Sequence, residues 1–108
     1  MEITKNTSCG ELNSDNIGSK VDLVGWVQRI RDHGGKKFVD LRDREGITQV
    51  LFDPDLTEEF EKLNDIGREY ILKVTGEVKK RPEGTENDEI KTGNIEIHAD
   101  NYNIVSKS

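Results

Sequence analysis

Phe38, in a short alternating stretch, is the residue best suited to bind a ligand. By strand alternation its side chain shares a face with Asp40 and Arg42, whereas Val39 and Leu41 share the other face. An aromatic ring on the polar face of a sheet can stack on a nucleobase, which is worth about 1–3 kcal/mol per base. The alternative is that a loop or a helix covers the ring. The sequence alone leaves both interpretations open.

Arg29, Arg31 and Gln49 are candidates for polar contacts around this ring. The two arginines stand two residues apart, so they point to one side of a strand, where they could flank Phe38 and contact phosphates or bases. Gln49 interrupts an apolar stretch, and its amide can donate and accept hydrogen bonds at a base edge. The simpler alternative for all three is a solvated surface side chain.

Catalytic motifs are lacking. The chain has no HExxH, no phosphate-binding glycine loop followed by Lys-Ser/Thr, and no GxSxG. Residues 32–35 (DHGG) predict a hairpin turn rather than a phosphate cradle, and His98 is expected to be exposed. The single cysteine, Cys9, excludes an internal disulfide and makes a cysteine-based zinc site a poor interpretation. We therefore expect an inert Cys9 in a cytoplasmic protein.

Alternating and periodic stretches predict the elements that must position these residues. Strands are expected at residues 21–30, 37–43, 47–52, 70–78 and 95–105. Gly25 suggests a bulge or a sharp bend in the first strand. Apolar residues at helical spacing over 56–66 predict an amphipathic helix of about three turns. Five strands with a helix between the third and fourth is the arrangement of the OB-fold Greek-key barrel.

Length and composition bound this interpretation. The 108 residues, 31% hydrophobic and 35% charged, suffice for one OB-fold domain with a small core, in which residues 1–20 form a polar lead-in. Apolar runs of only a few residues predict neither a membrane span nor a signal peptide. The chain ends directly after the last predicted strand, so we expect it to be a fragment of a larger protein.

The charge distribution is more informative than the net charge of −6, which alone argues against a nucleic-acid binder. Residues 26–49 hold six bases and four acids, a net charge of +2. Residues 51–69 hold seven acids and two bases, a net charge of −5. We expect the acidic segment, with the predicted helix, to face away from any polyanion bound by the basic one.

Several strings together resemble the N-terminal domain of aspartyl-tRNA synthetases, which are class II enzymes. They are residues 25–35 (GWVQRIRDHGG), 38–46 (FVDLRDREG), 81–85 (RPEGT) and 92–97 (TGNIEI). The last two are similar to the bacterial branch in particular. The resemblance covers essentially the whole chain and is specific as a combination, whereas Gly-Trp-Val alone is shared with asparaginyl and lysyl synthetases.

The resemblance implies an OB-fold that binds the anticodon loop of a tRNA. Phe38 matches the aromatic residue that packs on the central uridine. The positions that match base or phosphate contacts are Arg29, Arg31 and Gln49, and the loop from Arg81 to Asn87 matches one that approaches the first anticodon base. Many members carry arginine where this chain has Ile30, but alternation points Ile30 away from its neighbours, so we expect little loss of RNA contact.

The resemblance also implies partners and chemistry outside this chain. The full-length enzyme is expected to be a homodimer that activates aspartate with ATP and Mg²⁺ in a following catalytic domain. This domain is expected to need no cofactor, to contact no membrane and to contribute no catalytic residue. Its partner is tRNA(Asp), and His33 and Gly84, in two loops at the rim, resemble the relaxed type that also accepts tRNA(Asn).

Two alternatives remain open from the residues themselves. A free-standing single-stranded nucleic-acid binder of the same fold favours several exposed aromatics along its groove, because it must stack successive bases. Here only Phe38 is a convincing candidate, since Trp26 could be partly in the core. A protein- or sugar-binding OB domain needs no basic groove at all.

Overall fold

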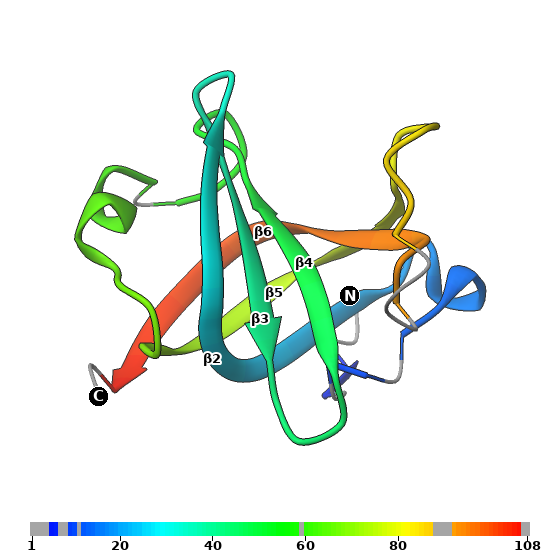
Figure 1. The fold of residues 1–108 in the computed structure, drawn as a ribbon, viewed down its shortest axis with the longest axis horizontal. Coiled ribbons are helices and arrows are strands. Elements are labelled where there is room, and N and C mark those ends of the chain that lie inside the picture. The colour runs from blue at the N-terminus through cyan, green and yellow to red at the C-terminus, as the bar shows by residue number, and fades with distance from the viewer. Residues whose placement is uncertain (1–4, 7–8, 11, 59, 88–91, 107–108) are drawn as a thin grey trace.

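The computed structural model describes residues 5–6, 9–10, 12–58, 60–87 and 92–106. The strands are β1 (Lys5–Asn6), β2 (Lys20–His33), β3 (Lys36–Arg42), β4 (Ile47–Phe52), β5 (Ile71–Lys80) and β6 (Ile95–Ser106). Two 3₁₀ helices, η1 (Ser14–Asn16) and η2 (Phe60–Asp65), lie in the connections. The described part of the chain is therefore mostly β (Figure 1).

Five of the strands close into a barrel. The order is β1-β2-β3-β4-β6-β5, and β5 pairs back onto β2 to complete the ring. The β4–β6 pair is parallel, whereas the other pairs within the ring are antiparallel. The short β1 runs parallel to β2 at Val21 and Asp22. The predicted five-stranded OB-fold barrel is confirmed.

β2 holds the barrel together because it pairs with two strands in succession. Its first half pairs with β5 up to Trp26, and its second half pairs with β3 from Trp26 to His33. Gly25 lies next to this switch, in the part of β2 that pairs with β5, and an added Cβ there would stand 2.5 Å from the Arg42 carbonyl oxygen. A register shift between Val27 and Arg29 follows. The bend visible in β2 (Figure 1) thus lies near the glycine, as predicted.

The core lies inside the barrel and follows the predicted alternation. Val39 and Leu41 are fully buried, and the Phe52 ring packs edge-to-face on Tyr102 with centroids 5.6 Å apart. The lead-in contributes Cys9, which is fully buried. The Cys9 N–H donates to the Asp43 carboxylate over 2.7 Å, and its carbonyl accepts from the Thr48 hydroxyl. This part of the lead-in therefore packs into the barrel rather than forming a loose polar tail.

The amphipathic helix predicted over 56–66 is not found among the described residues. Residues 54–58 form turns, and 3₁₀ helix η2 follows at Phe60–Asp65. The Asp53 carboxylate accepts from the Asp55 N–H, and the Thr57 hydroxyl donates to the Ala99 carbonyl. The first bond is local and competes with helical hydrogen bonding, and the second ties the segment to β6, in a stretch too short to stabilise a helix by itself. Leu63 is buried, as predicted for the apolar face, but Leu56 is exposed.

Within the described residues, no helix is both long enough and apolar enough to cross a membrane.

Candidate nucleic-acid interface

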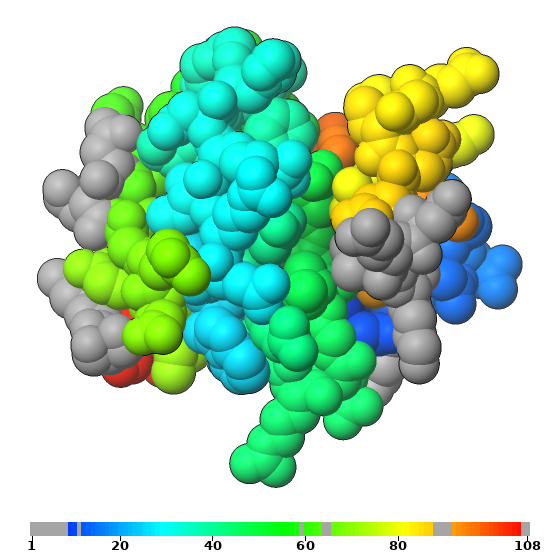
Figure 2. All heavy atoms as spheres, in the orientation of Figure 1, coloured from blue at the N-terminus to red at the C-terminus, as the bar shows by residue number. Residues whose placement is uncertain are grey.

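A groove runs over the outer surface of the barrel between the β2–β3 hairpin and the loop at 81–87. Its volume is about 600 Å³, within the range of roughly 300–1,000 Å³ of small-molecule pockets. Figure 2 shows the 81–87 loop as a separate lobe across from β2 and β3. The residues that line the groove include Arg31, Phe38, Gln49, Arg81, Glu96 and His98.

Phe38 lies in this groove opposite Arg31, its partner across the β2–β3 ladder. The Arg31 guanidinium carbon stands 5.9 Å from the centroid of the ring, at cation–π distance. The ring is half-buried and sits on the outer face, away from its buried neighbour Val39. The structure therefore brings an aromatic surface and the charge of Arg31 together, whereas Arg29, which the alternation also placed on this side, does not line the groove.

Gln49 links this pair to the opposite wall of the groove. Its carbonyl oxygen accepts from Arg31 Nη2 over 2.7 Å, and its amide nitrogen donates to the Glu96 carboxylate over 3.1 Å. The other Glu96 oxygen lies 2.7 Å from the His98 ring. A chain of polar side chains thus crosses from β2 through β4 to β6, and its members fix one another's orientation.

Glu96 and His98 line the groove, although the sequence analysis proposed neither as a binding residue. Glu96 is only 3% exposed, and His98 is half-buried rather than exposed as expected. Their alternation with Ile95 and Ile97 did place them on a polar face. The missing information was the parallel β4–β6 pairing, which sets His98 beside Leu51 and brings this face against Gln49.

Arg81 forms the wall of the groove on the loop side. Its guanidinium donates to the Ile95 carbonyl over 3.0 Å and to the Thr85 carbonyl over 3.3 Å, and the residue is 5% exposed. Burial lowers the pKa of this guanidinium, and the nearby charge of Glu96 opposes that shift. The side chain therefore holds the loop against β6 while lining the groove.

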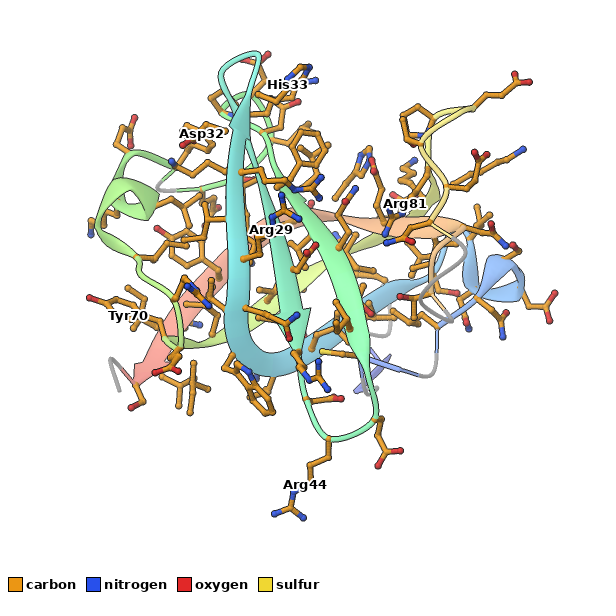
Figure 3. The ribbon with its side chains drawn as sticks, in the orientation of Figure 1. Arg29, Asp32, His33, Arg44, Tyr70 and Arg81 are labelled. Atoms are coloured by element: carbon orange, nitrogen blue, oxygen red, sulfur yellow. The ribbon has the colours of Figure 1, made fainter. Side chains whose placement is uncertain are left out.

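The other candidate residues lie at the rim or outside the groove. His33 lines the groove from the tip of the β2–β3 hairpin (Figure 3), and Gly84 turns the loop with φ of +88°. The Asn87 N–H donates to the Gly93 carbonyl and closes the base of that loop. Arg29 does not line this groove but borders a second one, and Trp26 is 37% exposed without lining either.

The electrostatics of the groove are mixed rather than uniformly positive. Lys36 and Arg31 contribute cations at the hairpin, and Asp32 and Glu96 contribute carboxylates. None of the described acidic residues of the 51–69 segment lines the groove, although Leu51 does. Such a site offers donors and acceptors at fixed positions, which suits the polar edges of bases better than a row of phosphates.

The described residues contain no group of three or more His, Cys, Asp or Glu side chains placed to hold a metal ion.

Comparisons with known proteins agree with this geometry. The model of the family described as OB-fold nucleic acid binding domain (tRNA anti-codon) matches residues 21–105. The aspartate–tRNA(Asp/Asn) ligase of Dictyoglomus turgidum is 55% identical over 89% of this chain and 16% of its own length. The corresponding ligase of Oleidesulfovibrio alaskensis is 47% identical over 96% and 17%. The chain thus spans about one sixth of these relatives.

A solved structure shows the same barrel. The aspartyl tRNA synthetase from Entamoeba histolytica superposes with a TM-score of 0.82 at 26% identity, covering 96% of this chain and 22% of that one. The matched region of the relatives is their N-terminal anticodon-binding domain. The chain therefore belongs to the family of OB-fold nucleic acid binding domains, and the predicted resemblance to the anticodon-binding domain of aspartyl-tRNA synthetases is confirmed.

Proposed function

We propose that this domain binds a tRNA anticodon loop in the groove between the β2–β3 hairpin and the 81–87 loop. The observation that carries the proposal is Phe38 on the outer face, with Arg31 over its ring and Gln49 bonded to Arg31 in the same groove. A base stacked on the ring presents its polar edge to these donors and acceptors. The base proposed to stack on the Phe38 ring is the central uridine of the anticodon.

The proposed contacts divide into two kinds. Arg31 and Gln49 contact the stacked base or its phosphate, whereas the loop with Arg81 and Asn87 approaches the first anticodon base. Because the Arg81 guanidinium already holds the Thr85 carbonyl, its contribution to binding is to position the loop. Arg29 contacts the RNA from outside this groove.

The proposed partners are tRNA(Asp) and tRNA(Asn), whose anticodons differ at the third base. Two observations support a relaxed specificity that accepts both tRNAs. The curated relatives are named as aspartate–tRNA(Asp/Asn) ligases. In addition, a Cβ at Gly84 would meet no atom within 4 Å, so the rim of the groove is open there.

The whole protein is proposed to be an aspartate–tRNA ligase of which this chain is the anticodon-binding part. Aspartate activation with ATP and Mg²⁺ then takes place in a region outside this chain, and no residue described above takes part. The proposed enzyme is a cytoplasmic homodimer.

The decisive experiment measures binding of anticodon stem-loops to this chain by fluorescence anisotropy at one salt concentration. The stem-loop with the aspartate anticodon should bind at least tenfold more tightly than the same stem-loop with adenosine at the central position. Tenfold corresponds to about 1.4 kcal/mol. Equal affinity for the two would contradict the proposal.

A second arm tests the free-standing single-stranded binder. Poly-dT of equal length should bind more weakly than the aspartate stem-loop, because only one stacking ring is available in the groove. A preference for poly-dT would favour the alternative, and no binding of either would favour a protein- or sugar-binding domain.

A further inference from the structure

A second groove lies on the other side of β2, and its lining is cationic. It is bordered by Gln28, Arg29, Ile30 and Arg68, and it contains no acidic lining residue. Figure 2 shows the turn that includes residues 66–70 beside β2 on the face that also carries the base groove. Two arginines from segments far apart in the sequence therefore meet at one place.

Both guanidiniums are available to a ligand. Arg29 and Arg68 are exposed, and neither makes a hydrogen bond or an ion pair with the described part of the chain. The nearby Arg42 differs, because its guanidinium donates to Gln28 over 3.0 Å. Arginine presents five donors in a planar fork that matches phosphate oxygens.

The backbone around the two arginines is fixed rather than loose. The Val27 N–H donates to the Tyr70 carbonyl over 2.8 Å, and the Glu69 N–H donates to the Val27 carbonyl over 2.7 Å. Between these bonds Glu69 has φ of +72°, a left-handed conformation that costs free energy in a residue other than glycine. These two hydrogen bonds, which we call the clamp, hold the turn that contains Arg68 against Val27 of β2. The register shift between Val27 and Arg29 follows directly.

The two grooves follow each other along β2. Arg31 lines the base groove, and Arg29, two residues earlier, lines the cationic groove. Two residues of a strand span about 7 Å. The two grooves are therefore close enough for one nucleic-acid chain to reach both.

We infer that Arg29 and Arg68 form a phosphate subsite that binds the RNA backbone next to the stacked base and contributes affinity without reading sequence. The inference rests on the proposed function for the identity of the polymer. It separates the two arginines of β2 by role, because Arg31 faces the base and Arg29 faces the backbone.

The test measures the salt dependence of stem-loop binding for R29Q, R68Q and the control R44Q. Arg44 is exposed in the β3–β4 turn, at the opposite end of the hairpin from His33 (Figure 3), and lines neither groove. In R29Q and in R68Q the slope of log K against log salt should fall by about 0.7–0.9, the value for one phosphate contact. R44Q should keep the wild-type slope, and the ratio between aspartate and adenosine-substituted stem-loops should stay within twofold in all variants.

Replacing single phosphates of the RNA loop by neutral groups locates the phosphate that the two arginines contact. Methylphosphonate groups placed singly along the loop should weaken wild-type binding at one or two positions, and R68Q should be insensitive at one of them. The inference is overturned if R29Q and R68Q keep the wild-type slope, if R44Q changes it equally, or if R68Q alters the base preference.

Failure of the inference is distinguishable from failure of the proposed function. If the wild type discriminates the central base but the slopes of R29Q and R68Q do not change, only the phosphate subsite is wrong. If the wild type shows no base discrimination but R68Q still lowers the slope, the subsite stands and anticodon recognition is wrong.

Discussion

Arg31 donates to the side-chain oxygen of Gln49 over 2.7 Å, and this bond sets the orientation of the Gln49 amide in the groove. With the oxygen turned to Arg31, the amide nitrogen faces Glu96 and donates to its carboxylate. The bond joins β2 to β4 across β3 on the outer face of the barrel. A buried amide with both ends satisfied is a stable element of a binding site.

This relationship predicts a pH-dependent defect in Gln49→Glu. The new carboxylate would face Glu96, which is only 3% exposed, in place of the amide donor. We expect the free energy of unfolding at pH 7 to fall by about 1–3 kcal/mol. Two facing carboxylates raise the pKa of one of them in the folded state, so part of the loss should be recovered as the pH falls toward 5. Urea unfolding at pH 7 and pH 5 measures both; a defect that grows on acidification would contradict the network.

Phe38→Ala should weaken binding of the aspartate stem-loop by about 1–3 kcal/mol and leave the fold intact, because the ring lies on the outer face. The matched control is Val39→Ala, since Val39 is fully buried next to it. That control should lower the melting temperature while binding per folded molecule stays unchanged. The opposite pattern, with Phe38→Ala unfolding the protein, would place the ring in the core.

Gly84→Asn should sharpen the choice between aspartate and asparagine stem-loops. The wild-type protein should bind the two within a factor of ten, about 1.4 kcal/mol. Asparagine tolerates the positive φ of +88° better than other residues with a side chain, so the loop should keep its conformation. The added side chain narrows the rim and should penalise one of the two loops by contact. Identical affinity ratios for wild type and variant would remove Gly84 from the specificity argument.

Gly76→Ala should destabilise the barrel strongly. A Cβ at this position would lie 2.5 Å from the His98 carbonyl oxygen, where β5 and β6 approach each other at a register shift. Relief of that overlap must separate the two strands, at a cost of about 1–3 kcal/mol or more. Gly67→Ala is the control, because the nearest atom to its Cβ would belong to the Tyr70 ring, at 3.4 Å, which is ordinary van der Waals contact. Thermal unfolding of the two variants should differ by several degrees.

The buried thiol of Cys9 should make the folded protein less stable at alkaline pH. Burial, assisted by the charge of Asp43, raises the pKa of its thiol in the folded protein. The unfolded chain therefore releases this proton first, at about pH 8.5, and stability falls by up to about 1.4 kcal/mol per pH unit above that value. Below pH 8 the thiol contributes no pH dependence. Cys9→Ala should have a shallower slope than wild type between pH 8.5 and 10 in urea titrations; equal slopes would contradict the shift.

The segment between β4 and β5, where a helix was predicted, differs most from its prediction. Apolar spacing correctly placed Leu63 and Ile66 toward the core. It could not show that the Asp53 carboxylate and the Thr57 hydroxyl would take up backbone partners around residues 53–57. Those bonds depend partly on the Ala99 carbonyl, which β6 supplies from more than forty positions away.

Local periodicity by itself determined the five strands, the inward and outward faces of β3, and the place of Phe38 on the outer one, because side chains alternate along any strand. Long-range strand pairing decided the rest. The parallel β4–β6 register brought Glu96 and His98 to Gln49. The clamp between Val27 and residues 69–70 set Arg29 beside Arg68 rather than beside Phe38. Such contacts join residues that are remote in the chain, and the spacing of neighbouring residues carries no information about them.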